Sequence, residues 1–526
     1  MIFLYIFTRY LKSYNIVSDF MSNKALTFIT QFTRDLVNLM VSFFLVMWIA
    51  PLHTPEPIEK YFVPYLIFCG LWVLVALILG RYKEPIKNQG YIPSVFKAFN
   101  TTVFVYAVAF SVIYFTEASY SVLVFLIISL CVFGCLFFVQ SLYFAILYAS
   151  DPEDDVTPIE KREPKQLVTK PEVISDDAYK SRKEAMVKWM GERAFDYLSG
   201  KVGVNMNTTK VLATTEIFNI EETTPYKYDT IINVRSLNNI RGINKMFSTI
   251  NEKLPDGGLY VGCFKQKSVT KKEILSKYPK GINWIVYTFY YFVKRVIPKL
   301  FFTKRLYYDI TKGKKRVLSK TEVFGRLYYC GFEIVDEKKV DRYTYFIARR
   351  LKEPPMNKKR RYGPIISLNR VGKNNRVFKF YKMRTMYPYS EFLQEYIYKK
   401  CGLQEGGKFT HDIRVSTSGR LMRKYWIDEF PMFINLFKGD MKLVGVRPLS
   451  KHYFSLYCEE LQQLRVKFKP GLLPPFYADM PKTLDEIQES ELRYLKMCQK
   501  RGSFITDIVY IWKIFVNIVF KRARSH

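Results

Sequence analysis

Two adjacent carboxylates, Asp428 and Glu429, open the apolar run Phe430–Phe437. Pro431 follows at a position that suits the first turn of a helix, where its missing N–H costs little. The carboxylates would then lie near a helix N-terminus, whose partial positive charge favours anions. In such a pair the Asp can act as a nucleophile while the Glu holds a metal ion. The plainer interpretation is a surface pair at the start of an amphipathic helix.

Basic residues that could bind a phosphate lie before and after this pair in the sequence. Gly439 is a natural helix stop, and the turn Gly445–Pro448 beyond it presents one guanidinium, that of Arg447. Such a group can hold a phosphate bidentately, and the charges of Lys382 and Arg384 can offset further phosphate charge. We therefore assign substrate binding to Lys382, Arg384 and Arg447. We assign it also to Pro448, which belongs to the turn that presents Arg447.

The basic segment Leu351–Met386 holds 11 Lys or Arg residues and one acidic residue, Glu353. Nucleic-acid binding is one interpretation of such a run. However, the cations of Arg376–Arg384 alternate with apolar residues as in a strand, which favours a folded surface near phosphates and no nucleic-acid partner. Asp412 and Arg414 are further candidates for positioning the substrate, and a structural pair between them is an equal alternative.

The composition indicates a membrane-associated chain of several domains. Among 526 residues, 49% are hydrophobic and 17% aromatic, and the formal net charge is +34. This excess implies an anionic partner: nucleic acid, phosphorylated small molecules or an anionic lipid surface. Eight Cys residues without a Cys-x-x-Cys spacing indicate free thiols in a reducing compartment. Four dispersed His residues are too few for a His-based metal site.

Four apolar spans precede residue 150, and buried core helices are the alternative to membrane crossing. A span needs about 20 residues, so the first and third are short. Lys and Arg lie before the first span and between the second and third, whereas the other two gaps carry little positive charge. The positive-inside rule then places both termini in the cytoplasm. The spans are Leu36–Leu52, Tyr61–Gly80, Phe99–Phe115 and Ser121–Ala149.

Residues 151–171 are typical of a linker, and residues 172–352 have an α/β pattern. A helix is expected over Asn238–Glu252. The order of elements is similar to the second half of class I methyltransferases, but Gly200–Gly203 lacks the spacing of a cofactor-binding glycine loop. We therefore expect a degenerate Rossmann-like module with a structural or regulatory role. The expected strands are Lys210–Ala213, Tyr228–Val234 and Gly258–Gly262, with a closing hairpin of Phe332–Val335 and Tyr343–Ala348.

Three further segments have helical character. Trp284–Phe302 and Ile505–Phe520 combine aromatic residues with basic flanks, which suits helices that lie in the headgroup layer. For each of them, packing in a protein core is an equal alternative. The carboxylate-rich stretch Asp485–Glu491 is expected to be a solvated helix.

Taken together, residues 363–526 resemble the bacterial sugar transferases, also called polyprenyl-phosphate phosphoglycosyl transferases of the monotopic type. Several motifs follow the order of that family. They are Gly363–Lys373, Phe380–Met386, Asp412–Arg420, Ile427–Pro431, Lys438–Met441, Val444–Pro448 and Lys469–Gly471.

The resemblance implies transfer of a sugar 1-phosphate from a UDP-sugar to polyprenyl (undecaprenyl) phosphate, with release of UMP. It implies an aspartyl-phosphosugar intermediate on Asp428 and Mg²⁺ held by Glu429, in a step that initiates exopolysaccharide, capsule or O-antigen repeat units. Two features depart from the family pattern. The long apolar re-entrant helix is missing, since Leu351–Tyr362 is short and basic, and Val446 replaces a Pro.

The predicted fold is therefore a multi-domain membrane protein. It has a four-helix transmembrane region (1–150), a linker (151–171), an α/β Rossmann-like domain (172–352) and an α+β, mostly helical, membrane-surface catalytic domain (353–526). We expect a multi-pass protein of the bacterial inner membrane with a cytoplasmic catalytic domain. Two other functions stay open: a membrane-anchored methyltransferase and a non-catalytic scaffold of a polysaccharide assembly complex. The oligomeric state is also open, a homo-oligomer included.

Overall fold

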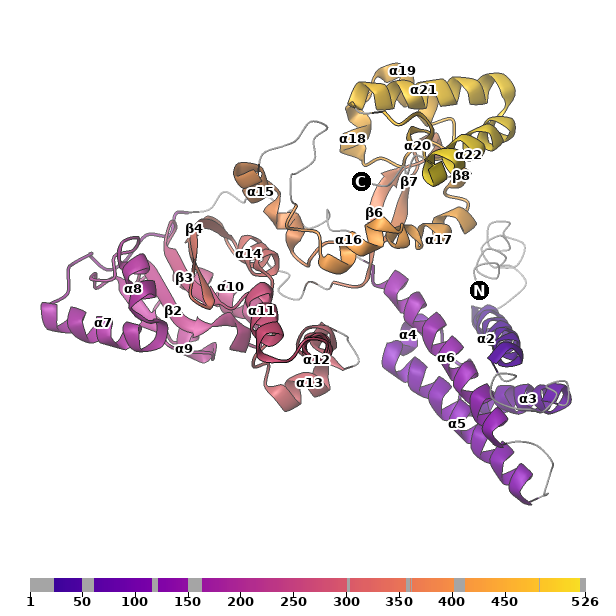
Figure 1. Cartoon of the computed structure of the whole chain (residues 1–526), viewed down its shortest axis with the longest axis horizontal. Coiled ribbons are helices and arrows are strands. Elements are labelled where there is room, and N and C mark those ends of the chain that lie inside the picture. The colour runs from indigo at the N-terminus through magenta and orange to yellow at the C-terminus, as the bar shows by residue number, and fades with distance from the viewer. Residues whose placement is uncertain are drawn as a thin grey trace. The chain divides into compact units, whose positions relative to one another are not determined.

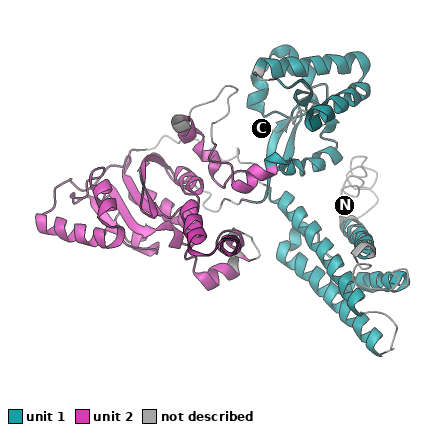
Figure 2. Cartoon of the chain, in the orientation of Figure 1, with its two compact units in different colours: residues 1–151, 363–384, 423–526 teal, residues 152–362, 385–422 magenta. Residues whose placement is uncertain are grey.

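The chain forms two compact units, which are described here each by itself (Figure 2). The first contains residues 1–151, 363–384 and 423–526, and the second contains residues 152–362 and 385–422. The chain therefore enters the second unit twice. The computed structural model describes residues 23–49, 61–115, 122–149, 163–299, 303–355, 360, 362–401, 412–481 and 483–520.

Long apolar helices form the N-terminal part of the first unit (Figure 1). Three of them, together with α22 near the C-terminus, are long and apolar enough to cross a membrane. The fourth N-terminal helix, α3, is also apolar but has 17 residues. The helices are α2 (Asn23–Ile49), α3 (Phe62–Ile78), α4 (Ile86–Gln89), α5 (Tyr91–Phe115) and α6 (Val122–Leu147).

These helices confirm that each of the four apolar spans is helical, whereas the expected short length of the first and third is wrong. Helix α2 begins at Asn23 and helix α5 at Tyr91, so they have 27 and 25 residues. The start of α5 follows from Gly90, which has φ +77°, and from Pro93 in the first helical turn. The expected ends at residues 50–52 and at 121 lie outside the described residues.

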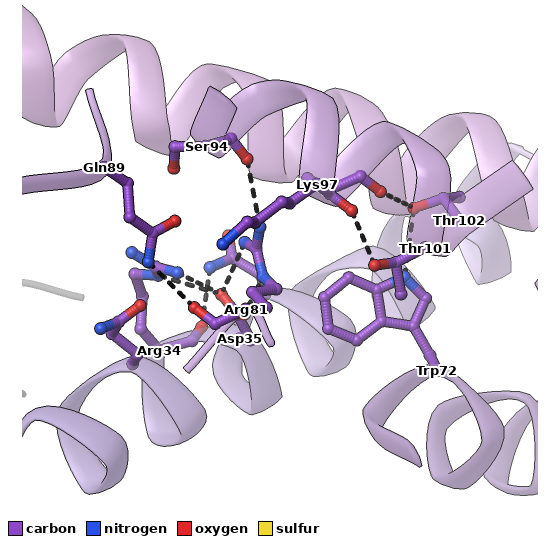
Figure 3. Close-up of polar contacts among 12 residues, drawn as sticks. Arg34, Asp35, Trp72, Arg81, Gln89, Ser94, Lys97, Thr101 and Thr102 are labelled. Atoms are coloured by element: carbon purple, nitrogen blue, oxygen red, sulfur yellow. Dashed lines mark hydrogen bonds and ion pairs between the residues drawn. The ribbon is translucent and has the colours of Figure 1, made fainter. Parts of the chain in front are cut away.

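A buried ion pair joins α2 to the segment after α3 (Figure 3). Arg81 donates from Nε to Oδ2 of Asp35 over 2.6 Å, and the two side chains are 2% and 0% exposed. The same guanidinium donates to the carbonyl of Ser94 in α5 over 3.3 Å and lies 5.5 Å from the centre of the Trp72 ring. Polar contacts therefore fix α2, α3 and α5 to one another near Arg81.

The rest of the first unit surrounds a β-hairpin and a two-stranded parallel sheet. Strand β6 (Ile365–Val371) pairs antiparallel with β7 (Val377–Met383), and β8 (Lys442–Val444) pairs parallel with β9 (Gly471–Leu473). A core around Val444, Leu461 and Tyr494 joins the short sheet to helices. The helical elements are η6 (Lys373–Asn375), η8 (Ile427–Glu429), α17 (Met432–Phe437), α18 (Lys451–Ser455), α19 (Glu459–Arg465), α20 (Phe476–Asp479), α21 (Leu484–Arg501) and α22 (Ser503–Phe520).

The second unit contains a five-stranded mixed sheet of order β1-β2-β3-β5-β4. The first three strands are parallel, and β4 and β5 form an antiparallel hairpin at one side. This confirms the expected strands and closing hairpin, while the Rossmann-like assignment stays a prediction. The strands are β1 (Thr209–Leu212), β2 (Thr230–Ser236), β3 (Leu259–Phe264), β4 (Phe332–Val340) and β5 (Tyr343–Arg350).

Helices cover both faces of this sheet. One core contains residues of α10 and α14, and the other contains residues of α7 and α8. Residues 351–355, 360 and 362, the described part of Leu351–Tyr362, form no helix. The helical elements are α7 (Asp176–Met190), α8 (Glu192–Ser199), α9 (Phe218–Glu221), η3 (Leu237–Asn239), α10 (Ile243–Lys253), α11 (Lys267–Lys277), α12 (Ile282–Tyr291), η4 (Phe292–Val296), η5 (Ile297–Lys299), α13 (Lys304–Thr311), α14 (Lys320–Tyr329), η7 (Ser390–Leu393), α15 (Gln394–Cys401) and α16 (Thr417–Lys424).

The helix expected from Asn238 begins only at Ile243, so its predicted start is wrong. The side chain of Asn238 donates to the carbonyls of Lys265 and Arg316 over 3.1 and 2.7 Å. It also accepts from the backbone N–H of Lys265 over 2.7 Å. These contacts keep Asn238 in a short 3₁₀ turn between three loops, and the α-helix starts after Gly242.

Candidate active site

The two carboxylates lie in the 3₁₀ turn η8, directly before helix α17. Trp426 starts the turn with φ +53°, and Pro431 at φ −62° leads into α17. Gly439 has φ +73° and follows the end of that helix. The sequence prediction of a helix that starts near Pro431 and stops at Gly439 is therefore confirmed.

Asp428 is only 7% exposed, and its Oδ1 atom has no hydrogen-bond partner among the described residues. Most buried polar atoms in proteins are paired, and an unpaired one costs about 1–3 kcal/mol. An unpaired buried polar atom can serve a ligand or a reaction. Oδ1 of Asp428 is such an atom, and its role as the nucleophile stays a prediction.

Glu429 lies next to a cation, because Lys382 donates from Nζ to its Oε1 over 3.0 Å. Lys382 is on β7, 47 residues earlier in the chain. The buried Asn435 of α17 connects the two elements: its Oδ1 accepts from the backbone of Tyr381, and its Nδ2 donates to the carbonyl of Lys379. These bonds of 3.0 and 2.7 Å fix α17 to β7 and so place Lys382 at Glu429.

Sequence reasoning missed Asn435. The one signal for it was an amide inside the otherwise apolar run Phe430–Phe437, a position where an unpaired polar group would be unfavourable.

Arg384 is half-buried and directly follows β7, two residues after Lys382. Its Nε donates to the carbonyl of Gly363 over 3.0 Å, and its backbone N–H donates to the carbonyl of Pro364 over 2.7 Å. The Gly-Pro opening of the segment therefore fixes Arg384, close in sequence to Lys382.

Arg447 presents an exposed guanidinium on a backbone that a buried ion pair holds in place. Its N–H donates to Oε1 of Glu491 over 3.4 Å, and its carbonyl accepts from Arg465, which also pairs with Glu491. Burial raises the pKa of Glu491, and Arg465 opposes that rise. Glu491 is 0% exposed, so the expectation of a solvated stretch is wrong for this residue, which the helix α21 turns inward.

Two glycines let the loops that carry Arg447 and Lys469 cross at backbone distance. A Cβ atom on Gly471 would lie 2.0 Å from the backbone nitrogen of Gly445, and one on Gly445 would lie 2.8 Å from that of Gly471. The carbonyl of Val446 accepts from Gly471 over 3.0 Å. Pro448 lies at the end of this crossing and is buried, which gives it a structural role. Its role in substrate binding stays a prediction.

Asp412 and Arg414 belong to the second unit, where they pair with each other. Arg414 donates from Nε to Oδ1 and from Nη2 to Oδ2 of Asp412, over 2.9 and 2.8 Å, and from Nη1 to Gln394 over 2.6 Å. The structural pairing is therefore observed. Their role in positioning a substrate stays a prediction.

The residues around the carboxylates are apolar and exposed. Helix α22 adds a second surface of this kind: one face, with Tyr510 and Ile514, is buried in the core around Val444, while Phe504 and Trp512 on the other are exposed. The packing expected as one alternative for Ile505–Phe520 is thus confirmed, while a place in the headgroup layer stays a prediction. The exposed residues flanking the carboxylates are Tyr425, Ile427, Phe430, Phe433 and Phe437.

Lys442 holds α22 in place. It donates from Nζ to both carboxylate oxygens of Asp507 and to the hydroxyl of Tyr494, each over 2.9 Å. Burial, together with the neighbouring Asp507, raises the pKa of Tyr494 well above its usual range, so its hydroxyl keeps its proton.

Within the described residues, no cluster of three or more His, Cys, Asp or Glu side chains is placed to hold a metal ion. Mg²⁺ does not need such a cluster, since one or two carboxylates plus substrate phosphates are sufficient. Asp428 and Glu429 are compatible with that second kind of site.

Comparison with known proteins shows that part of the chain is similar to one protein family. The family described as "Bacterial sugar transferase" matches residues 356–521. A galactosyl transferase of Streptococcus agalactiae serotype III is 41% identical over 114 residues, 21% of this chain and 25% of the relative. A UDP-N-acetylgalactosamine-undecaprenyl-phosphate N-acetylgalactosaminephosphotransferase of Aeromonas hydrophila is 40% identical over 168 residues, 30% and 36% of the two chains.

An undecaprenyl-phosphate galactose phosphotransferase of Salmonella typhimurium is 34% identical over 116 residues, 21% of this chain and 24% of the relative. The matches to these three relatives thus span between about a quarter and just over a third of each relative's length.

Proposed function

Because residues 356–521 match the family described as "Bacterial sugar transferase", we propose that this chain transfers a sugar 1-phosphate from a UDP-sugar to polyprenyl phosphate and releases UMP. The observation that carries the proposal is Asp428, whose buried Oδ1 has no donor among the described residues while the adjacent Glu429 meets Lys382. The names of the relatives support undecaprenyl phosphate as the acceptor.

The first step uses Asp428 as the nucleophile. Its Oδ1 forms a bond to the phosphorus that carries the sugar, and the bond from that phosphorus to the bridging oxygen breaks. The bridging oxygen leaves with the electron pair as part of UMP. An acyl phosphate that carries the sugar then remains on Asp428.

The second step regenerates the carboxylate. A phosphate oxygen of the polyprenyl phosphate forms a bond to the same phosphorus, and the bond to Oδ1 of Asp428 breaks. The product is a polyprenyl diphosphate sugar, and Asp428 is again free as a carboxylate. Atoms and electrons balance without any oxidant or further co-reactant.

Lys382 and Arg447 offset the charge that moves between the phosphates. Lys382 already contacts Glu429, and the exposed Arg447 is held by the Arg465–Glu491 pair. Glu429 is the residue that would hold Mg²⁺, which supplies charge neutralisation at the diphosphate. To bind it, Glu429 would use its second oxygen or release Lys382.

The exposed apolar residues that flank the carboxylates indicate where the reaction would take place. Phe430 and Phe433 are exposed beside Asp428, a surface that suits contact with the lipid part of an acceptor. We propose that the protein lies in the bacterial inner membrane, with this site on the cytoplasmic side. There it would begin the assembly of polysaccharide repeat units.

The test incubates the purified full-length chain with undecaprenyl phosphate and a panel of UDP-sugars and measures UMP and the lipid product. We expect UMP release that depends on acceptor, on one or a few donors and on Mg²⁺, with loss of turnover in excess chelator. Glu429→Gln should lower turnover and weaken the response to Mg²⁺. Full turnover in chelator would overturn the metal role, and the absence of any lipid-linked sugar with every donor would overturn the function.

A further inference from the structure

The second unit carries an apolar surface that the proposed chemistry does not use. Helix α12 continues into η4, and its outer side chains are mostly apolar and exposed. Ile285 is 71% exposed and Phe289 is 70% exposed. Two residues of α13, Leu306 and Ile310, are also apolar and exposed. We call the following six residues the α12–α13 surface: Ile282, Ile285, Phe289, Phe292, Leu306 and Ile310.

The inner face of the same helix carries the polar anchors. Asn283 donates from Nδ2 to the carbonyl of Leu275 over 3.0 Å. The buried Arg295 of η4 donates to the carbonyl of Val317 over 2.6 Å and to Glu322 over 2.9 Å. A helix at a water-exposed surface normally has the reverse arrangement, with apolar residues inside and polar residues outside.

A single exposed Leu or Phe needs no explanation, but a helix face of such residues does. The outer residues Ile282, Ile285, Phe289 and Phe292 follow a spacing of three and four, so they form one stripe along the helix.

Cations border this stripe. Lys271 places Nζ 4.5 Å from the centre of the Trp284 ring, and Lys267 places Nζ 4.9 Å from that of Tyr291. Residues 265–316 contain 15 Lys or Arg residues against two acidic ones, Glu273 and Asp309. A helix that lies in a membrane interface has this combination of an apolar stripe, aromatic residues and surrounding Lys or Arg.

We propose that the α12–α13 surface docks the second unit onto an anionic lipid bilayer. The cations match the charge of anionic headgroups, and the stripe supplies apolar side chains to enter the layer below them. A nucleic acid would use the cations but leave the apolar stripe exposed to water. A protein partner would cover the stripe, but it would not require the excess of cations.

Helices α5 and α6 are long and apolar enough to span a bilayer. If they do so, they keep the second unit close to that bilayer. A unit tethered in this way meets the membrane at high effective concentration, so weak docking is sufficient.

The experiment uses the full-length chain in nanodiscs that contain phosphatidylglycerol. The photoreactive residue p-benzoylphenylalanine replaces Phe289 or, as a matched control, Phe218, which is 64% exposed on α9 of the same unit. We expect about 10-fold more lipid adduct from position 289 than from 218, with a severalfold loss in 1 M salt or in phosphatidylcholine alone, because part of the attraction is electrostatic. Equal lipid adducts at both positions, or crosslinks from 289 to protein only, would overturn the proposal.

A second measurement does not depend on the crosslinker. Hydrogen exchange of residues 282–299 should be slower in anionic nanodiscs than in detergent. Ile285→Glu combined with Phe289→Glu should remove that protection, while Phe218→Glu should keep it. Since both outer positions are exposed, these changes leave the inner anchors intact. Protection that persists in the double variant would contradict membrane docking, and neither result depends on the transferase reaction.

Discussion

In the proposed reaction, Asp428 is the nucleophile. We expect Asp428→Asn to lower turnover by at least about 1,000-fold, because an amide is a far weaker nucleophile than a carboxylate. The fold should stay intact, as the side chain is isosteric. UMP release and the Tm of the full-length chain are the measurements. The matched control is Asp485→Asn on the exposed side of α21, which should keep full turnover. A sugar phosphate adduct recovered on a peptide without residue 428 would contradict the assignment.

The buried Arg465–Glu491 pair forms hydrogen bonds to the backbone of Arg447 and so stabilises that loop. We expect Arg465→Met to lower stability by about 3–5 kcal/mol, because it leaves Glu491 buried without its partner. The change should appear as a lower Tm and as weaker donor binding, since Arg447 loses its support. Arg493→Met provides the comparison: Arg493 is 62% exposed in its pair with Asp479, and such pairs contribute about 0–1 kcal/mol. Equal Tm values for the two variants would show that the buried pair does not hold the loop.

Among the elements, the crossing of the loops at Gly445 and Gly471 fixes the backbone next to Arg447. We expect Gly471→Ala to displace the loops and to abolish most UMP release, because its Cβ would lie 2.0 Å from a backbone nitrogen. The matched change is Gly200→Ala, where the nearest atom to the new Cβ is 3.6 Å away and φ is −77°. Turnover that survives in Gly471→Ala would mean that the crossing can open without moving Arg447.

The apolar helices depend on the Asp35–Arg81 pair in the same way. Asp35→Asn should lower the Tm of the full-length chain in detergent, because it leaves the buried Arg81 without a carboxylate partner. Arg81→Met alone should also lower it: Asp35 keeps its 2.7 Å pair with Arg34, but the link from Asp35 to the segment after α3 is lost (Figure 3). The double variant should lose less than the sum of the two, by a coupling of about 0.5–3 kcal/mol. Glu84→Gln, at an exposed side chain of the same segment, is the control. Additive losses would show that the pair does not couple α2 to the segment after α3.

For the whole molecule, the distribution of Lys and Arg predicts the direction of insertion. We expect Thr54→Cys to react with a membrane-impermeant maleimide from outside the cell, and Lys83→Cys to react only after the membrane is opened. Labelling of the unsubstituted chain measures the reaction of the native cysteines and serves as the control. Labelling of position 83 from outside would reverse the topology and would place the carboxylate site away from the cytoplasmic nucleotide sugars.

The features that depend on neighbours in the chain could be predicted from the sequence. The four apolar helices, the strands of the second unit and the helix between Pro431 and Gly439 follow from periodicity and from the backbone preferences of Pro and Gly. The Asp428–Glu429 pair was visible for the same reason, as were the motifs that resemble the sugar transferases.

The features that need contact between residues distant in the sequence became visible in the folded structure. Lys382 meets Glu429 across 47 residues of sequence, Asn435 ties α17 to β7, and Arg465 pairs with Glu491. The solvated character expected for Glu491 and the helix start expected at Asn238 were wrong for this reason. Local polarity predicts exposure, but a buried partner elsewhere in the chain can offset the cost of removing a charge or an amide from water.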